Sequence, residues 1–510
     1  MSTPQNSNKD TVLVVLPYGM CFRAVVLNKS LWSFLTQKYE VDVMTPLKVT
    51  AQVRKDYGIR NILPFRSPKK HLAIVQSIAH RLLHWWKFCD LAHFLFMGDL
   101  GENYALRYRW ATPGLRRQML FFAALNNTIF TRLFKFLFNN AILSLYPTSF
   151  YIQENRYKFV LVSHVSESEC VLTSIIAEKF GISVITSTLG MDNYMHGLLP
   201  FAPDLMLLWG EEQAYEFNQF HLPLNKELSK TKYEIVGSPS YDNYLEISND
   251  SSKCSKEIFQ KILGPAQSND DIEIILFPAF VEYCNPGQTA LTELIVKFIK
   301  ENSAQIKLLI RVRPNIDEEM WKTFQKKHSE NVILQIPQGA SYDKSGYRST
   351  FEPEKEQKEM EVFVNTVKYS TLLINPSPST MIYDSILLDT PSVYALFNWD
   401  EKIATRKAIP HQQQKFYLGK SLTYPQRKGF NVIYNKEDFA RFLHGFFILK
   451  ERNGYISKEL LKIVATDSAD GCSGERTVHA IENFFGSNSG KKSKSENIRI
   501  TARQKSESQP

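Results

Sequence analysis

The chain has 510 residues, too many for one small domain and enough for about two to four domains of ordinary size. With 44% hydrophobic and 22% charged residues, it is not mainly disordered, collagen-like or a coiled coil. Sixty-one Lys and Arg against 52 Asp and Glu give a net charge of +9, which suits anionic phosphate substrates or an anionic membrane surface.

The cysteines and the first residues bear on the cellular compartment. The six cysteines form no CxxC pair and no Cys/His cluster, so we expect free thiols in a reducing compartment and no structural zinc. Residues 1–10 are polar and are predicted to be disordered, and we expect no secretory signal before the first apolar run. Polar residues interrupt the most hydrophobic region, Met119–Leu145, so we predict no spanning helix. The expectation is a cytoplasmic protein that can sit peripherally at the inner face of a membrane.

The first elements form a βαβ unit. Val12–Leu16 is a continuous apolar run, as expected for a parallel strand covered on both faces. A turn at Pro17–Gly19 follows, then an amphipathic helix over Ala24–Gln37 and a strand over Val41–Thr45.

Residues 61–158 are rich in aromatic and basic side chains and are predicted to be mainly helical. Thirteen Lys and Arg against four Asp and Glu give this region a charge of +9, equal to that of the whole chain. His80–Phe96 and Met119–Phe138 are typical either of helices in a membrane interface or of a buried helical subdomain with its basic residues in water. No nucleic-acid-binding motif accompanies the charge.

Strands and helices then alternate, which favours parallel sheets because parallel strands need crossover helices. Before the polar stretch 246–271, strands are predicted at 159–164, 182–187, 205–209 and from 233 to a Gly-Ser-Pro turn, with helices at 167–180 and after Gly210. After it, strands are predicted at 272–278, 307–314, 332–337, 371–375 and 392–397, helices at 289–301, 317–327, 360–368, 379–388 and 439–450, and a polar loop at 338–357. The basic, low-complexity tail 486–510 is predicted to be disordered.

The segment Ile374–Phe397 is the most informative for function. A strand ends in a loop of small hydroxyl residues, and a helix begins at once. Unpaired N–H groups and a partial positive charge at a helix start suit phosphate, and Ser377, Ser379 and Thr380 add hydroxyl donors. Asp384 lies about one turn on and can accept hydrogen bonds from ribose hydroxyls. The alternative is that Ser379 only caps the helix.

Two arginines lie on the second predicted strand of the second series, at 307–314. Arg311 and Arg313 alternate along it, so both point to the same face. Such a pair can neutralise a diphosphate through bidentate contacts. The alternatives are a salt bridge to Glu318 or Glu319, or a solvated edge.

The loop after the strand at 182–187 contains candidates for a general base. Asp192 and His196 are both side-chain types that can deprotonate an acceptor hydroxyl, and Gly190 permits an exposed tight turn. Alternatively, Asp192 caps a short helix and His196 lies at the surface.

Three further residues are candidates for lining a cleft. Gly19 and Arg23 lie at the first βα turn, and His164 follows the strand at 159–164. We interpret the neighbouring Glu167 as an acidic residue in the first turn of the following helix, where the helix dipole stabilises its charge, and not as a cleft residue.

The 374–397 segment resembles the nucleotide-sugar half of GT-B glycosyltransferases, and it is similar to the related sugar-nucleotide 2-epimerases and CDP-glycerol glycerophosphotransferases. The resemblance implies that Ser379 and Thr380 hold a diphosphate, that Asp384 stands where a ribose-binding Glu is usual, and that 389–393 replaces a Gly-x-Pro-Val step. Ile235–Asp242 resembles the turn that crosses between the domains, and Ser187–Tyr194 occupies the place of a catalytic loop.

The fold expected from this resemblance is α/β, with two Rossmann-like domains facing a cleft and a helical basic-aromatic insertion in the first. The boundaries are an acceptor domain at 11–245 with the insertion at about 61–158, a linker at 246–271, and a nucleotide-donor domain at 272–485.

The implied activity is glycosyl transfer from a nucleotide-diphosphate donor to a saccharide or lipid-linked acceptor in surface polysaccharide or glycoconjugate synthesis. Basic groups would stabilise the leaving diphosphate, so no metal is implied. The alternatives are a sugar-nucleotide 2-epimerase and a non-catalytic, membrane-associated scaffold of GT-B shape.

Overall fold

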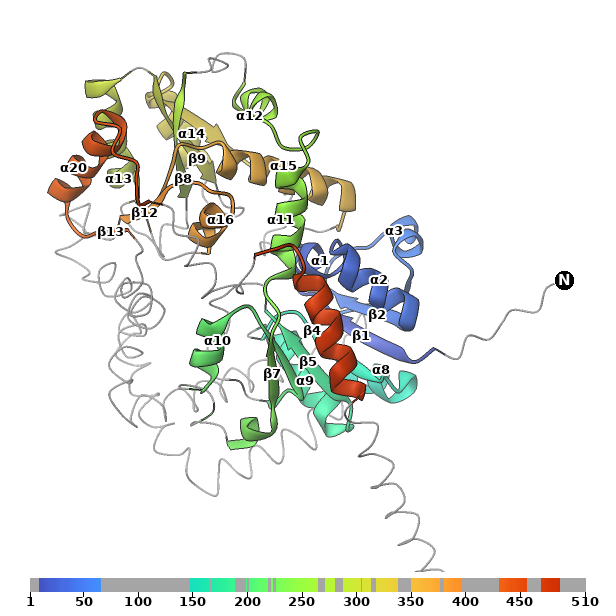
Figure 1. Cartoon of the computed structure of the whole chain (residues 1–510). Helices are drawn as coiled ribbons and strands as arrows, with labels where there is room; N and C mark the ends of the chain where they lie inside the picture. Colours follow the sequence, from blue (N-terminus) through green and yellow to red (C-terminus); the bar gives the residue numbers. More distant parts are fainter. Residues whose placement is uncertain are drawn as a thin grey trace, which may run out of the picture.

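The computed structural model describes residues 9–65, 147–165, 167–188, 199, 201–218, 222, 226–264, 271–279, 288–303, 305–312, 318–337, 350–376, 380–395, 431–455 and 469–486. These residues form two parallel β-sheets with helices packed on them (Figure 1). Most of the aromatic-basic region (66–146) and both tails (1–8 and 487–510) lie outside the described residues, and so do the expectations placed on them.

The first lobe is built on a seven-stranded sheet in the order β3-β2-β1-β4-β5-β6-β7. Its strands are β1 (Thr11–Val15), β2 (Glu40–Thr45), β3 (Ile59–Pro64), β4 (Phe159–Val162), β5 (Ser183–Ser187), β6 (Leu205–Leu208) and β7 (Lys232–Ile235). Its helices are α1 (Gly19–Val25), α2 (Lys29–Lys38), α3 (Ala51–Asp56), α8 (Pro147–Asn155), α9 (Ser168–Lys179) and α10 (Glu211–Glu216). The strand order reverses between β1 and β4, and ligands of open α/β sheets bind outside the carboxyl ends of the strands at such a point.

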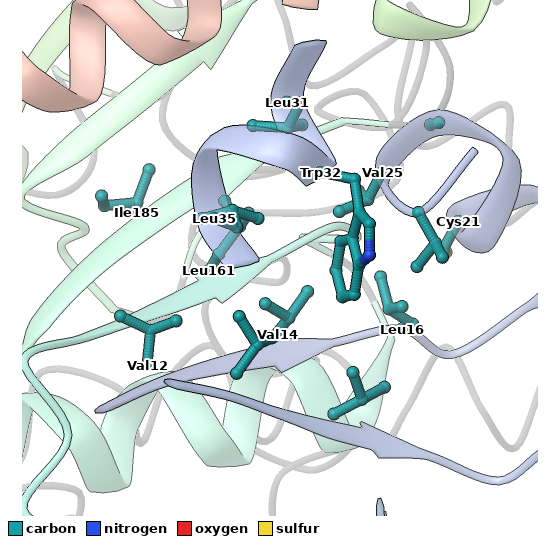
Figure 2. Packing of buried hydrophobic residues seen from close by; sticks show 14 of the residues in the cluster. Val12, Val14, Leu16, Cys21, Val25, Leu31, Trp32, Leu35, Leu161 and Ile185 are labelled. Atoms are coloured by element: carbon teal, nitrogen blue, oxygen red, sulfur yellow. The ribbon is translucent and has the colours of Figure 1, made fainter. Parts of the chain in front are cut away.

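The central strand β1 explains the apolar run at the start of the chain. Val12 and Val14 point to one face, where they pack with Leu35 of α2 and Cys21 of α1 (Figure 2). Leu13 and its alternate neighbours point to the other face, toward α9. Because helices cover both faces, each of these strand residues is buried, and the run is continuous instead of alternating.

The helix expected over Ala24–Gln37 is two helices, α1 and α2. Asn28 separates them: its side-chain oxygen accepts a hydrogen bond from the Leu31 N–H at 3.0 Å and so caps α2. Its amide also donates to Pro239 O at 3.1 Å and to Asp242 at 3.0 Å. The break therefore serves a contact with a distant segment, which the local hydrophobic period does not reveal.

Strand β3 overlaps the start of the region predicted to be helical, and that prediction is wrong there. Arg60 of β3 donates to both carboxylate oxygens of Asp42 on β2, at 2.8 and 2.6 Å. The Tyr157 hydroxyl donates to the same carboxylate at 2.7 Å. Asp42 is fully buried, so this ion pair fixes the edge of the sheet by long-range contacts.

The second lobe is built on a six-stranded sheet in the order β10-β9-β8-β11-β12-β13. Its strands are β8 (Glu273–Ala279), β9 (Ile306–Val312), β10 (Val332–Gln335), β11 (Leu372–Asn375), β12 (Ser392–Ala395) and β13 (Val432–Ile433). Its helices include α13 (Gln288–Asn302), α14 (Glu318–Lys327), α15 (Pro353–Lys368), α16 (Met381–Leu387) and α20 (Lys436–Phe447). The strand order reverses between β8 and β11. The prediction of two Rossmann-like sheets is confirmed.

Helix α15 begins seven residues before the predicted start, inside the stretch expected to be a loop. Pro353 stands at the first helical position, where its missing N–H costs nothing, and Glu354 and Glu356 lie in the first turn. Just ahead of it, Phe351 is fully buried in the core of the first lobe and stacks on Phe22 at 4.1 Å. The start of α15 therefore belongs to both lobes.

Two more segments join the lobes. Helix α11 (Pro239–Asn249) runs between them, and the last described helix, 473–486, lies along the first lobe (Figure 1). Ala480, Ile481 and Phe484 of this helix pack into the β1 core, although the sequence boundaries assigned it to the second domain. The stretch expected as a linker contains α12 (Lys256–Leu263), which buries Phe259 against the second lobe.

The helix 473–486 is held by Asp242 on α11. The Asp242 carboxylate accepts hydrogen bonds from the Ser473 N–H at 2.9 Å and from the Gly474 N–H at 2.6 Å. Gly474 is required there, because a Cβ at this position would lie 2.2 Å from the Asn28 side-chain oxygen.

Candidate active site between the two lobes

The elements that follow the switch points of the two sheets meet between the lobes. Helix α1 follows β1 in the first lobe and contacts α15 of the second. Helix α16 follows β11 in the second lobe and packs with α11 and with Trp209 at the end of β6. A ligand that binds outside the carboxyl ends of either sheet would therefore lie next to the other lobe.

An ion pair crosses this junction. Arg23 of α1 donates from Nε to the Glu356 carboxylate of α15 at 2.6 Å, and the two side chains are 17% and 2% exposed. The Asn243 amide on α11 donates to the Arg23 carbonyl at 2.9 Å. At Gly19, a Cβ would lie 3.3 Å from a Glu356 carboxylate oxygen, so this glycine permits the close approach. The two cleft candidates of the first turn thus lie at the contact between the lobes.

Arg311 forms a second ion pair on the same helix. Its guanidinium donates to Glu359 of α15 and to Gln335 of β10, and it lies 5.2 Å from the centre of the Phe363 ring. Burial lowers the pKa of Arg311, and the Glu359 carboxylate acts in the opposite direction. These partners differ from both carboxylates considered from the sequence. Arg313 lies outside the described residues.

Asp384 lies on α16 beside two tyrosines of α11. Burial raises the pKa of the Asp384 carboxyl to about 7, and the nearby Tyr241 hydroxyl acts to lower it, although it lacks the geometry of a regular hydrogen bond. Tyr244 is close enough to Asp384 for the carboxylate to raise the pKa of its phenol, after burial as the larger cause. Thr380 stands at the start of α16 without capping it, and Ser377 and Ser379 lie outside the described residues.

The first-lobe side of the junction holds a tyrosine, a histidine and a glutamate. The Tyr18 hydroxyl donates to Glu167 at 2.6 Å, and His164 Nδ1 accepts from the Glu167 main-chain N–H at 3.2 Å. The Tyr18 and His164 rings pack edge to face at 5.2 Å. Cys21 lies beneath them, and burial raises the pKa of its thiol to about 12, which makes it an inert core residue.

The loop with the predicted general bases lies outside the described residues, including Gly190, Asp192 and His196. The structure describes where this loop begins. The Thr188 carbonyl accepts from the Trp209 indole at 2.9 Å, and its hydroxyl accepts from the Gln213 amide at 3.2 Å. Next to Gln213, Glu212 is 1% exposed, and neither of its carboxylate oxygens has a hydrogen-bond partner within the described ranges. Burial raises its pKa to about 8.

The sequence reasoning missed the carboxylates on α15 and the tyrosines on α11. Glu356 and Glu359 are three residues apart, as are Tyr241 and Tyr244, which places each pair on one helix face. That spacing is visible once both segments are taken as helices. The residues described by the structure contain no group of three His, Cys, Asp or Glu side chains that could hold a metal ion.

Comparison with known proteins supports the fold and not a family. No protein-family model and no curated protein matches this sequence. A structure from Listeria monocytogenes described as a UDP-N-acetylglucosamine 2-epimerase matches with a TM-score of 0.51 at 11% identity, covering 94% of this chain and 97% of that one. S. aureus MnaA with UDP matches with a TM-score of 0.51 at 12% identity, covering 94% and 97%.

A glycosyltransferase from Rickettsia africae matches with a TM-score of 0.46 at 10% identity, covering 94% of this chain and 98% of that one. The two likenesses above a TM-score of 0.5 show the class of architecture that the sequence resemblance predicted. The chain has a GT-B fold of two Rossmann-like lobes with parallel sheets.

Proposed function

We propose that the protein is a GT-B-type glycosyltransferase that moves a sugar or a related group from a nucleotide-diphosphate donor to a saccharide or lipid-linked acceptor. The observation that supports this proposal is that the helices following the switch points of the two sheets lie together between the lobes. Helix α1, which follows β1, touches α15, and α16, which follows β11, packs on α11 and Trp209. Donor and acceptor sites on opposite lobes would therefore face each other.

The donor site would lie on the second lobe. Ser377, Ser379 and Thr380 would bind the diphosphate between β11 and α16, and Asp384 would accept hydrogen bonds from the ribose. Because a pKa of about 7 leaves Asp384 partly ionised at neutral pH, ligand hydroxyls can recruit its charged form. Arg313 would neutralise the diphosphate, whereas Arg311 is already occupied by Glu359.

The acceptor site would lie on the first lobe, with Asp192 or His196 as the base that takes the acceptor proton. The acceptor oxygen would attack the transferred group, and the nucleotide diphosphate would leave with the bonding electrons. The route needs no metal in principle, because basic groups can stabilise that charge.

The acceptor would belong to surface polysaccharide or glycoconjugate synthesis, and the basic region at about 61–158 would bind an anionic membrane surface that carries it. No helix within the described ranges is long and apolar enough to cross a membrane. Co-sedimentation with anionic vesicles should weaken with salt. Salt-independent failure to bind would remove the membrane contact from the proposal.

A second candidate is epimerisation of a nucleotide sugar. The likeness to the Listeria monocytogenes structure, described as a 2-epimerase, favours it. An epimerase would use the same donor site and need no acceptor.

A donor screen tests these proposals. The protein is incubated with UDP-, GDP-, CMP- and CDP-linked donors while thermal stability and nucleotide release are followed. Stabilisation by one donor, lost in Ser379→Ala and Arg313→Ala but kept in the control Arg441→Ala, supports the donor site. Arg441 suits the control because its side chain is 78% exposed and lies on α20.

The same screen separates the activities. Nucleotide release that requires an acceptor indicates transfer, and an isomerised donor without acceptor indicates epimerisation. If no donor stabilises or reacts with the protein, both enzymatic proposals fail and a non-catalytic scaffold remains.

A further inference from the structure

The hydroxyl of Tyr241 is buried and has no regular hydrogen-bond partner among the described residues. Tyr241 lies on α11, the helix between the lobes, and is 3% exposed. Its ring lies 5.3 Å from the Trp209 ring, and it shares one apolar cluster with Ile382 and Ile386 of α16. Burying a hydroxyl without a partner costs free energy, so we expect a role that compensates this cost.

The Tyr241 hydroxyl faces the Asp384 carboxyl. Burial is the largest cause that raises the pKa of Tyr241, and the charge of Asp384 acts in the same direction. In return, the Tyr241 hydroxyl acts to lower the pKa of Asp384, which burial raises to about 7. Besides burial, Tyr241 is the group among the described residues that acts on the Asp384 carboxyl.

The other titratable and charged groups at this place surround Tyr244, one turn along α11 from Tyr241. Burial is the largest cause that raises the pKa of the Tyr244 phenol, so this side chain stays neutral near neutral pH. The carboxylates of Asp384 and Glu359 act in the same direction as burial, and the guanidinium groups of Arg23 and Arg311 act against it. Each arginine is paired with a carboxylate of α15. We therefore assign a proton exchange near neutral pH to Asp384.

The two sides of the Asp384 carboxyl differ in their surroundings. Asp384 is partly exposed, whereas Tyr241 is buried. The phenol therefore reaches the carboxyl from its buried side, and the exposed side is left to a ligand. An ionised carboxylate has about four acceptor positions, so it can accept from the phenol and from ribose hydroxyls at the same time.

We propose that Tyr241 positions Asp384 for ribose binding by donating a hydrogen bond to the buried side of its carboxylate. The inference rests on the proposed function, in which Asp384 accepts hydrogen bonds from the ribose. Ribose hydroxyls recruit the ionised carboxylate, and the phenol then gains the partner that it lacks in the free protein. Because Tyr241 lies on α11, the helix between the lobes completes the ribose site of the second lobe.

The test measures the affinity for UDP as a function of pH in the wild type and in Tyr241→Phe. Loss of one hydrogen bond to a charged group should move the pH at which UDP affinity falls from about 7 to about 8. UDP affinity of the variant should then be about tenfold weaker at about pH 6, and within about twofold of the wild type at about pH 9, where Asp384 is ionised in both proteins. Because the two affinities are compared at each pH, titration of the UDP phosphate cancels.

Two controls separate positioning from a loss of packing. Tyr39→Phe removes a phenol hydroxyl of similar burial, 4% exposed, from the core of the first lobe, and should leave UDP affinity and its pH dependence unchanged. In the Asp384→Asn background, Tyr241→Phe should change UDP affinity by the same factor at every pH. A constant factor in the presence of Asp384 would mean that Tyr241 only packs, and would overturn the proposal.

A measurement without ligand keeps this inference separate from the proposed function. Aspartate carboxyls are labelled with 13C, and the Asp384 signal is assigned by its loss in Asp384→Asn. This signal should titrate near pH 7 in the wild type and about one pH unit higher in Tyr241→Phe. An unchanged titration would overturn the inference and leave the proposed function intact. Failure of every nucleotide to bind the wild-type protein would overturn both.

Discussion

Glu212→Gln should stabilise the protein, and increasingly so as the pH rises. The Glu212 carboxyl is 1% exposed, and burial raises its pKa from 4.5 to about 8. Between these values the unfolded chain has released the proton that the folded chain still holds, so wild-type stability falls with rising pH. At about 1.4 kcal/mol per tenfold change in proton affinity, the loss is about 3 kcal/mol by pH 7 and about 5 kcal/mol once the folded carboxyl has also ionised. Glutamine keeps the shape of the side chain and removes the ionisation.

The measurement is urea unfolding of both proteins at about pH 5, 7 and 9, with the free energy of unfolding compared at each pH. The difference between variant and wild type should grow along this series. Glu211→Gln is the matched control, because Glu211 lies beside Glu212 on α10 but is exposed, and its effect should stay within about 0.5 kcal/mol. A difference for Glu212→Gln that does not change with pH, or that shrinks as the pH rises, would refute the reasoning.

Three further outcomes are expected. Asp42→Asn should cost about 3–5 kcal/mol of unfolding free energy, because it removes the fully buried one of the two carboxylates that pair with the Arg60 guanidinium. Glu40→Gln, which removes the 39% exposed carboxylate, should cost less than about 1 kcal/mol. Equal costs would contradict this account. Gly474→Ala should lower the free energy of unfolding by about 1–3 kcal/mol, because its Cβ would lie 2.2 Å from the Asn28 side-chain oxygen. Gly486→Ala should be nearly neutral, because no atom lies within 4 Å of the added Cβ. The denaturant midpoints of the two variants are compared with that of the wild type. In calorimetric titrations, the affinity for UDP should fall as the pH drops through about 7, where Asp384 becomes protonated. The Asp384→Asn variant should bind UDP about tenfold more weakly, and its affinity should not show this pH dependence. A pH dependence of UDP affinity that persists in the variant would exclude Asp384 as its source.

Much of the fold could be predicted because parallel sheets leave a strong local signal. The buried strands β1 and β8 are continuous apolar runs in the sequence. In the crossover helices, apolar residues recur with a period of about 3.6 residues. The features that were missed depend on distant contacts. Strand β3 is ordered by the ion pair of Arg60 with Asp42, and α15 starts early because Phe351 enters the other lobe. Neither partner is a neighbour in sequence.

The candidate site could be predicted only in part, for a related reason. The position of Gly19 and Arg23 at a βα turn predicted that they lie at the carboxyl edge of the first sheet, where α1 begins. The sequence could not show that Arg23 is paired with a glutamate 333 positions away. The sequence pattern of a charged strand residue such as Arg311 is also the same whether its side chain faces a ligand or a carboxylate of the protein itself.

The two ion pairs on α15 suggest how the junction tolerates buried charge before a ligand arrives. Glu356 neutralises Arg23 of the first lobe, and Glu359, one turn on, neutralises Arg311 of the second. Both carboxylates are at most 3% exposed, so removing either arginine would leave a buried negative charge and cost several kcal/mol. A bound diphosphate would add negative charge beside these carboxylates, and the net attraction must then come from other donors.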